Sequence, residues 1–303
     1  MTASQVKEVK HMTFAEKLKS LRKANGMSQE TLAEKIGVSR QAVTKWETEG
    51  GIPDIENLIS ISNLFGITLD EFLSEKIETA VSKGYLYESS TEYDIDGNKR
   101  FDMKLGGAYS LRVTGTDGEK VLIHLASNDI SSLESDFKVK IDDIRGRIDA
   151  DIKRKNGMTE ARAKEGLVIE LMLPNKYVDH LEIECNCDEL RFNHVKCETA
   201  EFKGKAKTVF IDSAEAKIEL DCNLDMDIRV SHFTGSLEIN QISSTSRLTV
   251  PENFAFQSVL KGLSNSISYE CGGSPADDFS DPDAENIVEL NGLRSELVIS
   301  REA

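Results

Sequence analysis

A repeat of about 19 residues in the second half of the chain constrains the fold most strongly. Blocks begin at residues 180, 199, 217, 236 and 255, and each contains two short runs with apolar residues at alternate positions. Such alternation is typical of strands, and units this short can bury an apolar face only by stacking on one another. The sequence therefore predicts a short parallel β-solenoid or roll at 180–273. The alternating pairs are Leu181/Ile183 with Leu190/Phe192, Ala200/Phe202 with Val209/Ile211, Ile218/Leu220 with Ile228/Val230, Leu237/Ile239 with Leu248/Val250, and Phe256/Ser258 with Ile267/Tyr269.

The segment that precedes the repeats has a different pattern. Asp96-Gly97-Asn98 and Asp117-Gly118 lie between alternating runs, and such dipeptides favour the tight turns of β-hairpins. We therefore expect an antiparallel cap that leads into the solenoid, so that residues 93–303 form one all-β domain.

Residues 13–75 instead show helical periodicity interrupted by capping residues. Asn25-Gly26 and Gly37 follow apolar stripes of helical spacing, as residues that end helices do. Helix starts are predicted by capping residues at Thr13, Ser28, Ser39, Asp54 and Thr68. The expected protein is thus an α + β multidomain chain: a tail at 1–12, a five-helix domain at 13–75, a linker at 76–92 and the all-β domain.

The helix expected at 40–47 has two chemically distinct sides. At about 100° per residue, Ala42, Val43 and Trp46 fall on one apolar wall that must face the core. The opposite side presents Arg40, Gln41, Thr44 and Lys45. Arginine can bind guanine, glutamine can bind adenine, threonine can contact a thymine methyl group, and lysine can neutralise phosphate or reach guanine. The turn at 37–39 between two short helices gives helix-turn-helix geometry, which lays the second helix in the major groove of DNA.

The same residues carry a family resemblance. SQETLAEKIGVSRQAVTKWE at 28–47, Pro53-Asp54, and LFGITLDEFL at 64–73 resemble the XRE-type, phage-repressor-like transcriptional regulators. The resemblance covers about residues 13–74. It implies that Gln29 contacts the DNA backbone and that Ser39, Arg40, Gln41, Thr44 and Lys45 read bases or anchor phosphates.

A second resemblance concerns the β region. The pattern over about 110–300 is similar to a bacterial family of adhesin-like, β-solenoid-like domains, in which Leu-x-Ile-x blocks recur at this period. This resemblance implies a fold and brings no catalytic residues.

Charge is distributed unevenly along the 303 residues. The chain has 37 basic and 53 acidic residues, a net charge of −16, of which residues 1–76 carry only −1. Because phosphate neutralisation supplies much of protein–DNA affinity, a nearly neutral helical domain favours action by two copies. We expect double-stranded DNA as a partner, a homodimer as the acting form, and an acidic β domain that projects away from DNA.

Two clusters outside the helical domain have metal-ligand character. Cys185, Cys187 and Cys197 lie near His194, but the inward parity of Cys185 and Cys187 favours buried structural thiols. The acidic run at 277–285 lacks the central glycine of an EF-hand loop, which favours a solvated loop. We therefore expect no metal, no cofactor and no catalytic residue.

Several functional classes remain open at this stage. No apolar run approaches the ~20 residues of a membrane helix, no secretory signal is visible, and five cysteines fit a reducing compartment, so the cytoplasm is expected. The favoured function is a sequence-specific transcriptional regulator whose β domain sets oligomeric state or senses an effector or partner. The alternatives are a β-solenoid scaffold that binds protein or saccharide, with a minor DNA-binding role, and a hydrolase that uses paired carboxylates.

Overall fold

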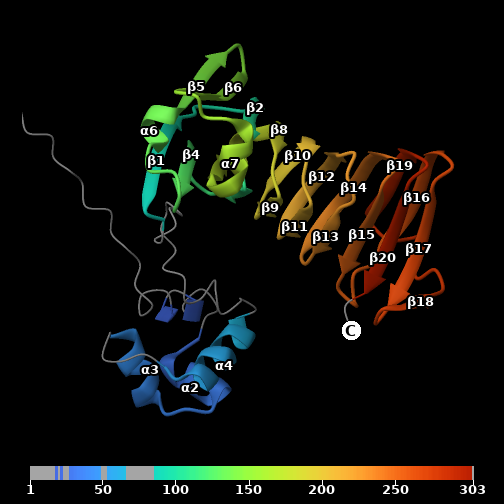
Figure 1. The fold of residues 1–303 in the computed structure, drawn as a ribbon. Helices are drawn as coiled ribbons and strands as arrows, with labels where there is room; N and C mark the ends of the chain where they lie inside the picture. Colours follow the sequence, from blue (N-terminus) through green and yellow to red (C-terminus); the bar gives the residue numbers. More distant parts are fainter. Residues whose placement is uncertain (1–17, 20, 23–26, 49–52, 66–84, 302–303) are drawn as a thin grey trace, which may run out of the picture. The chain divides into compact units, whose positions relative to one another are not determined.

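The computed structural model describes residues 18–19, 21–22, 27–48, 53–65 and 85–301 (Figure 1). The chain divides into two compact units, Met1–Ser82 and Lys83–Ala303. Each unit is described below by itself.

Short helices make up the described part of the first unit. These are α2 (Gln29–Ile36), α3 (Arg40–Glu47) and α4 (Ile55–Phe65), preceded by helical residues at 18, 19, 21 and 22. Three predicted caps are present: the Ser28 hydroxyl accepts from the Thr31 backbone N–H at 3.0 Å, Ser39 from Ala42 at 3.2 Å, and the Asp54 carboxylate from Asn57 at 2.9 Å. The helix starts expected at Thr13 and Thr68 lie outside the described residues.

The second unit is built from two sheets, with short helices α6 (Leu133–Asp136) and α7 (Glu160–Gly166) and a 3-10 turn at Asn175–Tyr177. The first sheet has eleven strands in the order β1 (Tyr87–Asp94), β4 (Lys120–Ser127), β7 (Val168–Pro174), β3 (Ser110–Thr116), β9 (Glu189–Asn193), β11 (Thr208–Asp212), β13 (Asp227–Val230), β15 (Thr245–Val250), β20 (Glu296–Arg301), β17 (Ser266–Cys271) and β18 (Ser274–Ala276). The second sheet has nine strands in the order β16 (Phe256–Leu263), β19 (Asn286–Leu293), β14 (Phe233–Ile242), β12 (Ala214–Asp221), β10 (Lys196–Lys205), β8 (Val178–Asn186), β2 (Lys99–Gly107), β6 (Arg147–Arg154) and β5 (Phe137–Ile144).

Neighbouring strands in the repeat region are parallel and one block apart. Thr199 lies opposite His180 and Lys217, and Lys217 lies opposite Ser236. The alternating apolar residues of the blocks that begin at 180, 199, 217 and 236 are buried in one continuous core. The block spacing thus determines which strands pair, because each inward side chain packs beneath its counterpart in the next block.

The fifth block does not lie where the repeat predicts it. β19 and β20 insert between the fourth block and the fifth, so that Ile287 lies opposite both Ser236 and Gln257. The inserted strands supply four fully inward aliphatic residues, whereas the fifth block places the polar residues Ser258 and Tyr269 at inward positions. The more apolar pair of strands therefore takes the fully covered place, and the fifth block ends the stack.

Both predicted hairpins are wrong, although antiparallel pairs do occur before the repeats. β1 and β2, on either side of Asp96-Gly97-Asn98, lie in different sheets, and β7 separates β3 from β4 on either side of Asp117-Gly118. The antiparallel pairs in this region are β1/β4, β4/β7 and β5/β6. A turn-forming dipeptide allows the chain to reverse but does not select a partner. β7 has all seven residues buried and takes a central place for that reason.

The expected linker at 76–92 also ends too late. β1 begins at Tyr87 and pairs with β4 along its whole length. Its polar residues obscure it in the sequence because β1 is an edge strand, where charged side chains are favoured.

One glycine on β14 occupies a place that no other residue fits. Gly235 has φ +134°, and a Cβ atom there would lie 2.1 Å from the backbone oxygen of Ala216 on the neighbouring strand. We expect Gly235→Ala to destabilise the β unit by about 1–3 kcal/mol because of the strained backbone conformation, and the clash with Ala216 adds to this cost. Far-UV circular dichroism during urea unfolding measures this. Gly97→Ala is the matched control, since its added Cβ meets open space; equal stability of the two variants would contradict the prediction.

Candidate nucleic-acid interface

Helix α3 is fixed to the first unit by one apolar side. Val43 is fully buried and Trp46 is 7% exposed, and both belong to a core shared with Leu32, Leu58 and Ile61. The predicted role of Trp46 as a core residue is therefore confirmed. Because this wall is locked in place, the orientation of the opposite side of α3 is determined as well.

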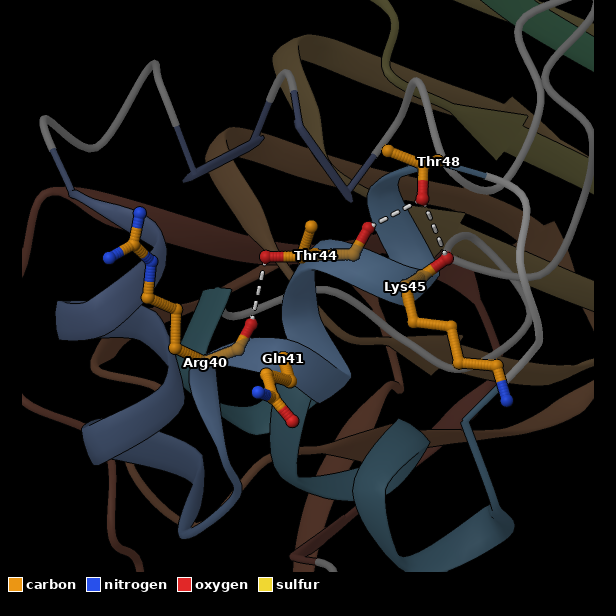
Figure 2. Close-up of a pocket in the computed structure, with 5 residues that line it drawn as sticks. All are labelled: Arg40, Gln41, Thr44, Lys45 and Thr48. Carbon is orange, nitrogen blue, oxygen red and sulfur yellow. Dashed lines mark hydrogen bonds between the residues drawn. The ribbon is translucent and has the colours of Figure 1, made fainter.

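The opposite side of α3 is exposed as its helical spacing predicts. Arg40, Gln41, Thr44 and Lys45 are all exposed, and with Thr48 they line one open surface hollow of about 640 Å³ (Figure 2). Both cations lie on this side together with an amide and two hydroxyls. The surface thus combines groups that bind phosphates with groups that bind base edges.

Within the described parts of the chain, Arg40 has one weak ion-pair partner. Its guanidinium lies 3.8 Å from the carboxylate of Glu30, and both side chains are more than half exposed. An exposed pair at this distance contributes little stability. A phosphate or a guanine edge can therefore replace Glu30 at small cost.

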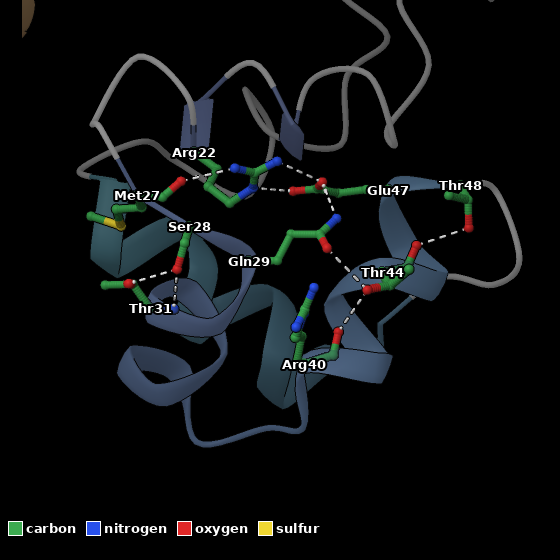
Figure 3. Close-up of polar contacts among 9 residues, drawn as sticks. All are labelled: Arg22, Met27, Ser28, Gln29, Thr31, Arg40, Thr44, Glu47 and Thr48. Carbon is green, nitrogen blue, oxygen red and sulfur yellow. Dashed lines mark hydrogen bonds and ion pairs between the residues drawn. The ribbon is translucent and has the colours of Figure 1, made fainter.

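Ser39 and Gln29 are engaged within the protein. Ser39 is the N-cap of α3, as described above. Gln29 is half-buried: its amide nitrogen donates to Glu47 at 2.8 Å, and the hydroxyl of Thr44 lies 3.1 Å from its amide oxygen (Figure 3). These bonds hold the Gln29 amide beside α3, and an amide nitrogen has a second hydrogen to donate. Their predicted contacts with DNA stay a prediction.

An ion pair that was not predicted from the sequence lies beneath this surface. Arg22 donates to both carboxylate oxygens of Glu47, at 2.6 and 2.9 Å, and to the backbone oxygen of Met27 at 2.8 Å. The side chains are 10% and 1% exposed respectively. A signal was present: Arg22 follows Leu18 by four residues and Glu47 follows Val43 by four, so each lies directly beside a buried apolar residue on its helix.

The pair shifts the titration of both partners. The hydrogen bond to Glu47 outweighs burial and raises the pKa of Arg22. Burial acts to raise the pKa of Glu47, but hydrogen bonds from Arg22 and Gln29 outweigh it, and the pKa lies below its ordinary value. Glu47 is therefore ionised at neutral pH and leaves no uncompensated charge in the core.

The two other clusters named in the sequence are parts of the β unit. Cys185, Cys187 and Cys222 are buried, and burial contributes to raising the pKa values of Cys185 and Cys222. The largest contribution to the raised pKa of Cys185 is its hydrogen bond with Cys187. Burial raises the pKa of Cys197 to about 12. Cys185 and Cys187 are thus buried, as predicted. The acids of the 277–285 segment are exposed, also as predicted.

Among the described residues, no helix combines the length and apolar character needed to cross a bilayer.

Comparison with known proteins identifies the family. A Helix-turn-helix family model matches residues 18–72. The transcriptional activator BcrR of Enterococcus faecalis is 49% identical over 63 residues, which cover 21% of this chain and 31% of BcrR. The HTH-type transcriptional regulator YqaE of Bacillus subtilis, itself uncharacterised, is 35% identical over 82 residues, which cover 26% of this chain and 71% of YqaE. The chain belongs to the HTH-type transcriptional regulators. It spans less than a third of the length of BcrR.

Matches to solved structures cover a larger share of this chain than the matches to the two regulators do. A protein of Clostridium sporogenes provisionally named a cell adhesion protein matches with a TM-score of 0.36 and 12% identity, over 71% of this chain and 99% of that one. A Bacteroides fragilis protein, provisionally an adhesin, matches with a TM-score of 0.26 and 11% identity, over 72% and 98%. A likeness of this degree defines no activity.

Removal of one partner of the buried ion pair has a large expected effect. We expect Arg22→Ala to lower the free energy of unfolding of the first unit by about 3–5 kcal/mol, because it leaves Glu47 buried and unpaired. Trp46 is the only tryptophan in the chain, so its fluorescence during urea unfolding reports on this unit alone. Lys35→Ala, on the exposed side of α2, is the control and should change little. A similar small effect in both variants would contradict the prediction.

The lowered pKa of Glu47 predicts a pH dependence. A carboxyl whose pKa falls on folding stabilises the fold fully above its unfolded pKa of about 4.3, and this contribution is lost as pH falls through the folded pKa. We therefore expect the thermal midpoint of unfolding, followed by Trp46 fluorescence, to decrease as the pH is lowered below about 4. In Glu47→Gln the acid dependence of this midpoint should be smaller, and an unchanged dependence would exclude Glu47 as its source.

Proposed function

We propose that this protein is a sequence-specific, DNA-binding transcriptional regulator. Helix α3 lies in the major groove of double-stranded DNA, where Arg40, Gln41 and Thr44 contact bases and Lys45 contacts phosphate or guanine. The observation that carries this proposal is the exposure of these four side chains on one side of a helix whose other side is locked by Val43 and Trp46. The match to the Helix-turn-helix family over residues 18–72 supports it.

The interior bonds of the first unit support the proposed roles of Ser39 and Gln29. The chain of hydrogen bonds from Arg22 through Glu47 and Gln29 to Thr44 links the core to the exposed side of α3 (Figure 3). In the proposed complex, the second amide hydrogen of Gln29 donates to a DNA phosphate. Ser39 orients the first turn of α3, whose N-terminal end favours anions.

The regulator acts as a homodimer in the cytoplasm, and its β domain sets the oligomeric state or senses an effector or protein partner. Two copies place two recognition helices in half-sites about one helical turn apart, ~34 Å. The near-neutral charge of residues 1–76 supports this arrangement, because one such unit neutralises few phosphates. No catalytic step belongs to the proposal.

Substitutions on α3 test the proposal. We expect Arg40→Ala or Gln41→Ala to weaken binding to a selected DNA site by about 1–3 kcal/mol and to relax specificity at one base pair. If Lys45 contacts phosphate, Lys45→Ala should weaken binding to all sequences similarly and reduce the salt dependence of log K by about one unit; if it contacts guanine, the variant should lose specificity at one base pair. Fluorescence anisotropy at several salt concentrations, on sites selected from genomic DNA by the purified protein, measures both quantities.

The control is Lys35→Ala, an exposed cation on α2 outside the hollow. Affinity and specificity that stay at the unsubstituted level in all three α3 variants would refute the site. Absence of salt-dependent DNA binding by the unsubstituted protein would refute the function.

A further inference from the structure

A carboxylate of α2 lies beside the exposed side of α3. Glu30 is in the first turn of α2, and its carboxylate lies 3.8 Å from the guanidinium of Arg40. Among the side chains that the structure describes in the first unit, two others carry a carboxylate: Glu47 is buried with Arg22, and Asp54 caps α4. Of the three, Glu30 is the one paired with a cation on the exposed side of α3.

The ordinary role of such an acid is to stabilise its own helix. A carboxylate in the first turn interacts favourably with the positive end of the helix dipole, and this role needs no partner on another helix. The side chain of Arg40 lies between α2 and α3 (Figure 3), so its pair with Glu30 links the two helices at the surface. An exposed pair contributes little stability, and its effect on how Arg40 meets DNA is therefore the more informative one.

Arg40 can contact DNA in two chemically different ways. A guanine edge offers the neutral acceptors O6 and N7, whereas a phosphate carries a negative charge. A guanidinium has several N–H donors in a fixed fork, so it can donate to guanine and to a carboxylate at the same time. Glu30 can thus stay beside Arg40 when Arg40 binds guanine.

Glu30 opposes the contact with phosphate. A phosphate at about 2.9 Å from the guanidinium places its charge within roughly one Debye length of the Glu30 carboxylate, ~8 Å at physiological salt. At this separation the two negative charges repel each other, whereas the neutral guanine edge is not repelled. The carboxylate therefore makes phosphate a poorer ligand of Arg40 than guanine.

We propose that Glu30 is a positioning residue that directs Arg40 to a guanine edge and away from phosphate. The inference rests on the proposed function, because it concerns how α3 reads DNA. It adds a specificity-determining residue that belongs to α2 and does not line the hollow at α3.

The role of Glu30 matters most on DNA without the selected site. Such DNA offers Arg40 no guanine in the required place, so phosphate is its remaining ligand. Non-specific binding depends on neutralisation of phosphates, and Glu30 opposes that step. Glu30 thus lowers the affinity for non-specific DNA more than the affinity for the selected site, and it raises the ratio of the two affinities.

Glu30→Gln tests this role, because it removes the charge and keeps the size and polarity of the side chain. Fluorescence anisotropy of the full chain, at one fixed salt concentration, measures its affinity for the selected site and for a duplex without that site. We expect the ratio of the two affinities to fall at least about threefold, mainly through tighter binding to the second duplex. Glu30→Asp keeps the charge and should keep the ratio of the unsubstituted protein.

Arg40→Ala supplies the background that separates positioning from other roles. With Arg40 absent, Glu30→Gln should leave the ratio unchanged, because no guanidinium remains to be directed. A change in stability of α2 alters both affinities by the same factor and so does not change their ratio. An unchanged ratio in Glu30→Gln would overturn the proposal. An equal fall of the ratio in both backgrounds would also overturn it, since Glu30 would then act on DNA without Arg40.

The outcomes also separate the role of Glu30 from the proposed function. If Arg40→Ala relaxes specificity at one base pair and Glu30→Gln leaves the ratio unchanged, the role of Glu30 is refuted and the DNA-binding regulator is retained. If the unsubstituted protein shows no salt-dependent binding to DNA, the function itself is refuted.

Discussion

The buried ion pair between Arg22 and Glu47 joins the core of the helical unit to its exposed recognition side. Glu47 accepts two hydrogen bonds from Arg22 and one from Gln29, which in turn lies within hydrogen-bond distance of Thr44 on α3. A carboxylate in this position is costly unless each oxygen is satisfied, and here each oxygen is. The same bonds that compensate for its burial therefore also fix the geometry of the side of α3 that we propose enters DNA.

The β unit follows a different constraint, namely the register of parallel strands. Each inward aliphatic residue packs against its counterpart one block away, and the same register aligns outward residues into rows. In the second sheet one of these rows is acidic over eight strands. Lysines in the flanking rows offset it, as Lys203 does between Glu182 at 2.8 Å and Glu201 at 3.0 Å. The row ends at β16, where Val259 lies opposite Glu289.

Local chemistry predicted well where neighbours in sequence are neighbours in space. The caps at Ser28, Ser39 and Asp54, the buried Trp46 and the exposed Arg40, Gln41, Thr44 and Lys45 all follow from helical spacing within a few residues. The predictions of hairpins at Asp96-Gly97-Asn98 and Asp117-Gly118 were wrong because the pairing of strands depends on the burial of residues distant in sequence, such as those of β7. The Arg22–Glu47 pair was missed because helical spacing shows that each residue lies beside a buried apolar residue but does not indicate that two residues 25 positions apart pair with each other.

The sequence by itself determined the helix-turn-helix unit, the period of the stacked strands and the residues that face the core, because each depends on spacing along one element. Only the tertiary structure decided that β19 and β20 insert before the fifth block and that the 277–285 segment covers half of the last strand. Those outcomes depend on which of several similar strands buries its apolar side chains most completely, a competition between distant segments that no local pattern records.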